Sequence, residues 1–144
     1  MKNRRELMSE ARDHVVPLSR QAVETIDALR PLTGRMAFLF PSITCAQRPL
    51  TEAALERLLW RADLAGIHVQ HGWRACFSTV MNDRNRSDRF VIDLMLAHKP
   101  KDEVEATYNR AQHMSRRREI AQEWADLLLE AMPSAVELVN MRRK

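Results

Sequence analysis

The sequence predicts one mainly α-helical domain with a small β-hairpin or sheet near its N-terminus. The chain has 144 residues, which is the length of a single domain with a core of its own. Apolar residues recur every three or four positions along several stretches, which is the spacing of one face of an amphipathic helix. Only three glycines occur, which argues against a turn-dense all-β fold and against a long glycine-rich phosphate loop.

The N-terminal third is expected to hold the strand and the first helix. Residues 1–13 are charged and expected to be poorly ordered. Residues 14–18, HVVPL, are short and β-branched, which is typical of a strand with its proline near the end. Ser19 is then expected to cap a helix that Pro31 ends. The apolar residues 36–40 predict a buried short strand or a buried extended segment.

Five further helices follow from the apolar spacing and from residues that start or stop helices. They are expected at residues 52–65, 72–81, 88–97, 102–113 and 116–131. Thr51 caps the first of them and Gly66 ends it. Pro100 breaks the third, because proline disfavours the helical conformation in the residue before it. We assign three aromatic side chains to the core, namely Trp73, Phe77 and Trp124.

The chain is expected to have three parts: the N-terminal segment 1–13, a domain at 14–132 and a basic C-terminal tail at 133–144. Lys and Arg number 23 against 19 Asp and Glu, so the formal net charge is +4. That excess permits a nucleic-acid partner without requiring one.

The cysteines and the hydropathy pattern exclude other classes of protein. Cys45 and Cys76 lie 31 positions apart without CxxC spacing, so we expect reduced thiols, with neither a zinc site nor a disulfide framework. The N-terminus has no apolar signal region, and no uncharged run approaches the roughly 18 residues of a membrane span. We therefore expect a cytoplasmic protein that does not enter a membrane.

Four short motifs stand out by their order along the chain. They are VPLSRQA at residues 16–22, HGWR at 71–74, LAH at 96–98 and TYNRA at 107–111. The HxxR spacing puts His71 and Arg74 on one face of a helix. His98 follows Arg74 by 24 positions, and Tyr108, the only tyrosine, follows His98 by ten.

Each motif alone also has a purely structural explanation. A histidine at the end of a helix, such as His98, is favoured by the helix dipole. A single tyrosine on a helix, such as Tyr108, is more often a packing residue than a chemical one. The arginine run at residues 116–118 is expected to be a solvated helix face. The joint occurrence of the motifs in one order is what favours chemistry.

In order, spacing and wording, these motifs resemble the tyrosine recombinases. The segments VPLSRQA, LAHK and YNRA are similar to the integrases of prophages and genomic islands, and the resemblance covers about residues 14–130. It implies the fold of the family's C-terminal catalytic domain and DNA integration through a 3′-phosphotyrosyl intermediate, with no metal or other cofactor. It also implies double-stranded DNA as a partner, and contacts between integrase protomers through the C-terminal segment.

The resemblance gives each matching residue a role. Tyr108 would attack the phosphodiester as the nucleophile and release a 5′-hydroxyl. Arg74 would hold the non-bridging phosphate oxygens with a bidentate fork that lysine cannot reproduce. His71 would assist proton transfer at the nucleophile. His98 would donate a hydrogen bond to the phosphate in the transition state.

The sequence departs from the family pattern at two catalytic groups. The family uses a second arginine well upstream of the VPL strand, and the arginines before that strand are too close to it to match: Arg4, Arg5 and Arg12. The family also places a general-acid lysine seven positions before the valine of VPL, where this sequence has Ser9. Lys2 is the only nearby lysine. We therefore expect a catalytic domain truncated at the N-terminus that is inactive or impaired alone.

Four interpretations stay open at this point. The chain is a recombinase remnant, a non-catalytic DNA- or integrase-binding module, an enzyme that takes the absent groups from another chain, or a small basic helical protein unrelated to recombination. A covalent adduct between Tyr108 and nicked DNA would separate the enzyme from the other three.

Overall fold

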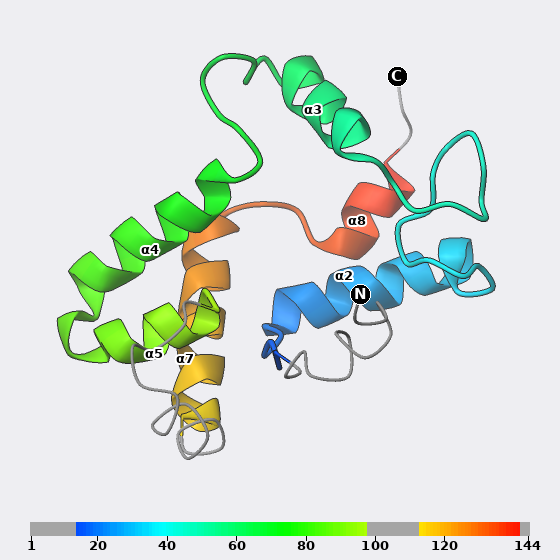
Figure 1. Ribbon diagram of the computed structural model, residues 1–144. Coiled ribbons are helices and arrows are strands. Elements are labelled where there is room, and N and C mark those ends of the chain that lie inside the picture. Colours follow the sequence, from blue (N-terminus) through cyan, green and yellow to red (C-terminus); the bar gives the residue numbers. More distant parts are fainter. Residues whose placement is uncertain (1–13, 98–112, 142–144) are drawn as a thin grey trace, which may run out of the picture.

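The computed structural model describes residues 14–97 and 113–141 of the chain, and in these residues the protein is helical (Figure 1). The helices are α2 (Arg20–Thr33), α3 (Glu52–Arg61), α4 (Gly72–Arg84), the 3-10 turn η1 (Arg86–Asp88), α5 (Arg89–Met95), α7 (Met114–Leu128) and α8 (Ala135–Asn140). The prediction of a mainly α-helical protein is confirmed.

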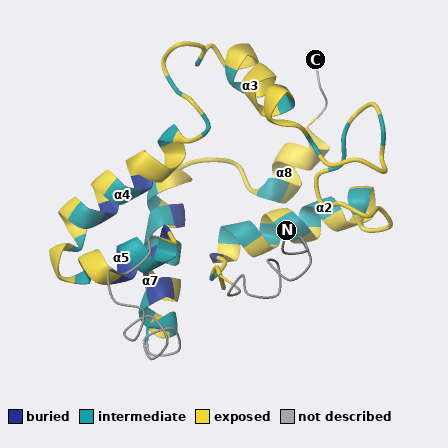
Figure 2. Ribbon diagram, viewed as in Figure 1, coloured by how far each residue is buried: buried dark blue, intermediate teal, exposed yellow. Residues whose placement is uncertain are grey.

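The core lies where α4, α5 and α7 meet (Figure 2). Its buried apolar side chains are Phe77, Met81, Val91, Ile92, Leu96 and Ile120. Phe77 and Met81 lie four residues apart on α4, which places them on one face of that helix, while α5 with its C-cap contributes Val91, Ile92 and Leu96 and α7 contributes Ile120. Trp124 packs on this cluster and meets the ring of Phe77 edge to face, with 5.6 Å between the ring centroids. The core assignment of these two aromatic residues is confirmed.

Helix α2 joins this core through polar contacts and packs against α8 and α7. Ser19 caps it as predicted, because its side chain accepts a hydrogen bond from the Ala22 backbone N–H at 3.2 Å. The Arg20 backbone N–H donates to the Gln122 side chain of α7 at 2.9 Å. The cap and this bond fix where α2 begins relative to α7.

Helix α3 stands apart from the other described helices. Among the described elements none packs against it, and Figure 1 draws it at the top, away from the core. Trp60 is 68% exposed and Leu58 55% exposed. A hydrogen bond of 2.9 Å from the Gln70 side chain to the Glu52 carbonyl connects the start of α3 with the loop that leads to α4.

Two predicted extended segments differ from the structure. Residues 14–18 form no strand, because no segment of the described chain pairs with them, so the strand prediction is wrong there. In the described ranges, β pairing is limited to an isolated antiparallel bridge between Pro41 and Pro49. Residues 36–40 form bends with exposed side chains, Phe40 being 53% exposed, so their predicted burial is wrong too. The residues on the N-terminal side of the expected strand lie outside the described ranges.

Several helix boundaries also differ from the predictions. Helix α2 continues through Pro31, which stands in its last turn, and α4 extends three residues beyond the expected end. Helix α3 ends at Arg61, five residues before Gly66. The expected helix at residues 102–113 lies outside the described residues except for its last position. The short helix α8 lies in the stretch expected to be a tail.

None of the described helices combines the length and the apolar character that crossing a lipid bilayer requires.

Candidate active site

The HGWR motif forms the turn that starts α4. His71 is the N-cap residue, and Gly72 is the first residue of the helix. The Gly72 backbone N–H donates to the Val69 carbonyl at 2.8 Å, and the Arg74 N–H donates to the His71 carbonyl at 3.1 Å. The predicted start of this helix is confirmed. The backbone bonds hold His71 and Arg74 one turn apart on the same side of the helix start.

The imidazole of His68 packs under this turn. Its ring lies edge-on against Trp73, with 4.3 Å between the ring centroids. A Cβ atom on Gly72 would come within 2.9 Å of His68 Cε1, so glycine is what allows the ring to lie there. Trp73 itself is 45% exposed, because this contact covers only part of its ring, and its predicted place in the core is wrong.

Arg74 reaches from the start of α4 to the end of α5. Its Nη2 donates a hydrogen bond to the carbonyl of Leu96, the C-cap residue of α5. Leu96 is buried and opens the LAH motif. The structure therefore brings the arginine of one predicted motif onto the backbone of the next. A guanidinium carries five N–H donors, so one bond to a carbonyl leaves donors for a bound anion.

The other two predicted catalytic residues, His98 and Tyr108, lie outside the described residues. The chain is described up to Ala97 on one side and again from His113 on the other. Both flanks belong to helices that pack on the same core as α4. The structure thus brings together His71, Arg74 and the beginning of the LAH motif.

An open groove of about 870 Å³ runs beside His71 and Arg74. It lies between α3 and the loop before α4, and its lining includes Glu56, Arg57, Trp60, His68 and Gln70. Sequence reasoning missed these residues. The only signal for them was their position just before the HGWR motif, because none of them belongs to a motif. The lining carries both signs of charge, and the cationic side chains in it are Arg57 and Arg74.

The three arginines near the start of α7 lie in three different environments. Arg116 is ion-paired with Asp88 at 2.7 Å and with Glu119 at 2.6 Å. Arg117 is only 5% exposed, and its Nη2 donates to the Val15 carbonyl. Burial lowers its pKa, because desolvation penalises the charged guanidinium. The prediction of a solvated face for the whole run is wrong at this residue.

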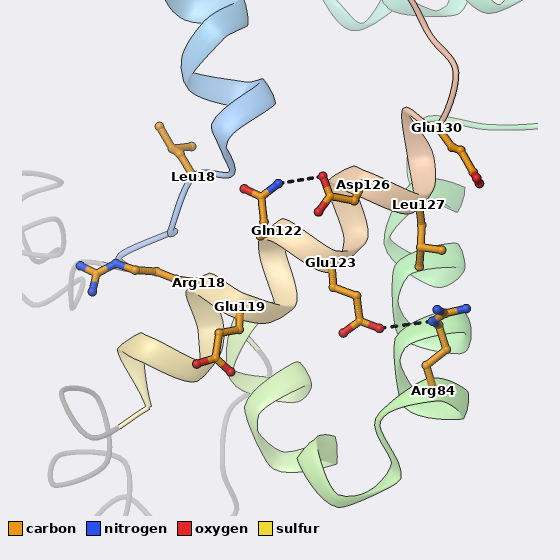
Figure 3. Close-up of a pocket in the computed structure, with 9 residues that line it drawn as sticks. All are labelled: Leu18, Arg84, Arg118, Glu119, Gln122, Glu123, Asp126, Leu127 and Glu130. Carbon is orange, nitrogen blue, oxygen red and sulfur yellow. Dashed lines mark hydrogen bonds and ion pairs between the residues drawn. The ribbon is translucent and has the colours of Figure 1, made fainter.

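Arg118, the third arginine, is exposed and lines a second groove of about 840 Å³ along α7 (Figure 3). Carboxylates dominate this groove, namely Glu119, Glu123, Asp126 and Glu130. Glu123 pairs with Arg84 at 3.2 Å, and Asp126 accepts from Gln122 at 2.9 Å. With more acidic than basic groups, this groove repels anions, so it is not a phosphate site.

The chain is similar to several curated integrases. It is 36% identical over 132 residues to prophage integrase IntA of Escherichia coli (strain K12), which is 92% of this chain and 32% of that protein. It is 39% identical over 123 residues to prophage integrase IntZ of the same strain, which is 85% of this chain and 30% of that protein. The integrase of Shigella phage Sf6 is 35% identical over 118 residues, 81% of this chain and 30% of that protein.

The chain spans about a third of the length of these relatives. No family model and no solved structure matches it. The similarity nevertheless extends over most of the chain and includes the HGWR and LAH motifs, which the structure brings into contact through Arg74 and Leu96. The protein is a member of the phage integrase family of tyrosine recombinases.

Proposed function

We propose that the chain is the catalytic domain of a phage-type integrase that breaks and rejoins double-stranded DNA. The observation that carries this proposal is the hydrogen bond from Arg74 to the Leu96 carbonyl. Through this bond the phosphate-binding arginine touches the backbone two residues before His98. Similarity to named integrases over most of the chain supports the same reading.

The proposed mechanism assigns one task to each of four side chains. The phenolic oxygen of Tyr108 attacks the phosphorus of the scissile phosphodiester and the bond to the 5′ oxygen breaks, this oxygen leaving as a hydroxyl when a general acid from elsewhere in the assembly protonates it. Arg74 and His98 donate hydrogen bonds to the non-bridging oxygens, whose negative charge grows in the transition state. His71 accepts the proton of the phenol. The resulting 3′-phosphotyrosyl bond conserves the energy of the broken bond for rejoining.

The 144 residues taken alone offer no match to the family's second arginine or to its general-acid lysine. Removing one preorganised donor to the phosphate costs about 10²–10³ in rate, and removing a general acid costs about 10²–10⁴. We therefore propose that the isolated chain cleaves DNA poorly and that the two groups come from elsewhere in an active assembly.

A substrate that needs no general acid tests the proposal despite this loss. The substrate is a pool of nicked duplexes of randomised sequence in which sulfur replaces the bridging 5′ oxygen, because a thiolate leaves without being protonated. We expect a covalent protein–DNA adduct with the wild-type chain and none with Tyr108→Phe. If no adduct accumulates on any member of the pool, the catalytic proposal fails.

A second candidate function is a non-catalytic module that binds DNA or another integrase protomer. It is favoured by the large apolar side chains that the described residues leave exposed in α8 and after it, including Val136, Leu138 and Met141. A stable complex with an intact relative, in the absence of any adduct, would support it. Monomeric behaviour together with no retention on DNA at low salt would contradict it.

A further inference from the structure

We propose that the imidazole ring of His68 positions the HGWR turn, so that His71 and Arg74 are presented to the groove together. His68 belongs to none of the four motifs and acts through its neighbours rather than on the DNA. All three side chains line the same groove. This inference rests on the proposed function, because it takes His71 and Arg74 to be groups that meet the scissile phosphodiester.

The ring of His68 lies beside the two residues that separate His71 from Arg74. It stands edge-on against the ring of Trp73, with 4.3 Å between the centroids and 63° between the planes. Three of its atoms, Cε1, Nδ1 and Nε2, lie 2.9–3.4 Å from the place that a Cβ atom of Gly72 would take. The short stretch between the two site residues is thus bounded on one side by this ring.

The loop that carries the ring is tied to α3 at two points. The His68 backbone N–H donates to the Leu64 carbonyl at 3.0 Å. The Leu64 N–H in turn donates to the Leu59 carbonyl of α3 at 2.9 Å. The Gln70 side chain donates to the Glu52 carbonyl, at the start of α3, at 2.9 Å. The ring therefore projects from a hydrogen-bonded loop.

The first turn of α4 is not stabilised by its own sequence. Its N-cap residue, His71, makes no side-chain capping bond, and its first turn holds no acidic residue and begins with glycine, which is unfavourable in a helix. The buried residues of α4 all come after Arg74. Two side-chain contacts reach this turn from other segments: the bond from Arg74 to the Leu96 carbonyl, and the ring pair of His68 and Trp73.

The shape of the His68 ring, rather than its charge, suits it to this role. Among the described residues its Nε2 is buried without a hydrogen-bond partner. Burying such an atom costs free energy, and a phenyl ring in the same place would avoid that cost. Because the atom is buried, it is also shielded from a ligand in the groove. The fold uses the edge-to-face contact, which an aromatic ring provides and alanine does not.

Hydrogen exchange at the first amides of α4 measures this role without any catalytic activity. We compare His68→Ala with His68→Phe and with the control His113→Ala, which removes a similar ring pair, with Phe90, at the start of α7. His68→Ala should lower the protection of the Gly72 and Arg74 amides about 10-fold, relative to amides in the second half of α4. His68→Phe should keep most of that protection, and His113→Ala should leave it unchanged.

Covalent trapping on the sulfur-containing duplex measures the consequence for the site. His68→Ala should lower the rate constant of adduct formation by about 10²-fold. The affinity for the duplex should change far less, because the groups that meet the phosphate are misaligned rather than removed. His68→Phe should restore most of the rate. A mere loss of folded protein would instead reduce the amount of adduct without changing its rate constant, and circular dichroism measures the folded fraction.

Unchanged protection of Gly72 and Arg74 in a folded His68→Ala chain would overturn the inference and leave the proposed function intact. An unchanged adduct rate in that variant, or a His68→Phe chain that behaves like it, would overturn the inference as well. No adduct with the unsubstituted chain would contradict the proposed function, and His68 would then support the fold alone. Should His68→Ala fail to fold, Trp73→Leu removes the ring pair from the other side, and the same selective loss of protection is required.

Discussion

The ring of His68 occupies the space that a side chain on Gly72 would need, at the turn that presents His71 and Arg74. A methyl group on Gly72 would lie 2.9 Å from His68 Cε1 and 3.3 Å from Nδ1. This close approach favours glycine at position 72 as long as the His68 ring stays where it is, although glycine is normally unfavourable within a helix.

The sign of the change in unfolding free energy in Gly72→Ala distinguishes the steric contact with His68 from the low helix propensity of glycine. Helix propensity alone predicts that Gly72→Ala stabilises the chain by up to about 1 kcal/mol. The contact with His68 predicts the opposite, a loss of about 1–3 kcal/mol, because the ring or the turn must move. Urea unfolding measures the difference. In a His68→Ala background the clash is absent, so Gly72→Ala should there be neutral or stabilising; destabilisation in both backgrounds would refute the explanation.

Arg74→Lys separates the catalytic role of this residue from its structural one. Lysine keeps the charge but loses the planar fork, so we expect adduct formation on the sulfur-containing duplex to fall by about 10²–10³. A hydrogen bond from a charged donor contributes about 1.5–3 kcal/mol to stability, so the free energy of unfolding should fall by no more than that amount when the bond to the Leu96 carbonyl is lost. An unchanged rate of adduct formation would remove Arg74 from the mechanism.

Arg117→Met tests whether the buried guanidinium stabilises the fold. Arg117 bonds to the Val15 carbonyl, while its Nε is buried without a partner. Val15 is 58% exposed, so water can replace the lost donor to its carbonyl. Methionine removes the cost of burying a charge. We therefore expect the free energy of unfolding to lie within about 1 kcal/mol of that of the unsubstituted chain, or above it. A loss above about 2 kcal/mol would mean that the bond to Val15 outweighs that cost.

The start of α8 should respond to acid. Ser134 and Glu137 form a capping box, and the two hydrogen bonds from Ser134 lower the pKa of the Glu137 carboxylate. A lowered folded pKa means that the stabilisation is present above the usual pKa of glutamate and is lost as the pH falls through the folded value. Hydrogen exchange at the first amides of α8 should therefore show lower protection in acid, corrected for the intrinsic exchange rate. Glu137→Gln should make that protection independent of pH over the same range; a wild-type response in this variant would exclude the carboxylate as the cause.

The sequence predicted local features where one residue type decides the geometry. The cap at Ser19 and the helix start at Gly72 are such cases, since each depends on neighbours within one turn. Helix α8 could have been found in the same way, because a serine followed three residues later by glutamate is the signature of a capping box. Pro133 was instead interpreted only as the residue that ends the preceding helix.

Features that depend on distant partners could not be predicted in this way. A strand at residues 14–18 needs a neighbouring strand, and β-branched composition does not supply one. The arginine run illustrates a second limit. Successive helix positions differ by about 100°, so three adjacent residues cannot all share one solvated face, and the sequence did not indicate that Arg117 is the inward one. His98 and Tyr108 stay predictions, since no described residue tests them.

The groove beside Arg74 has α3 on one side and the loop that carries His68 on the other, and these two sides differ in how well the rest of the described chain supports them. A helix of ten residues, with none of the described helices packed against it, is shorter than the roughly 12–15 residues at which isolated helices become stable in water. Its order in solution therefore depends on what covers it, whereas the opposite wall is set by the His68 turn. A macromolecule that enters the groove would complete the folding of one side by binding, and its measured affinity would include the free energy of that ordering.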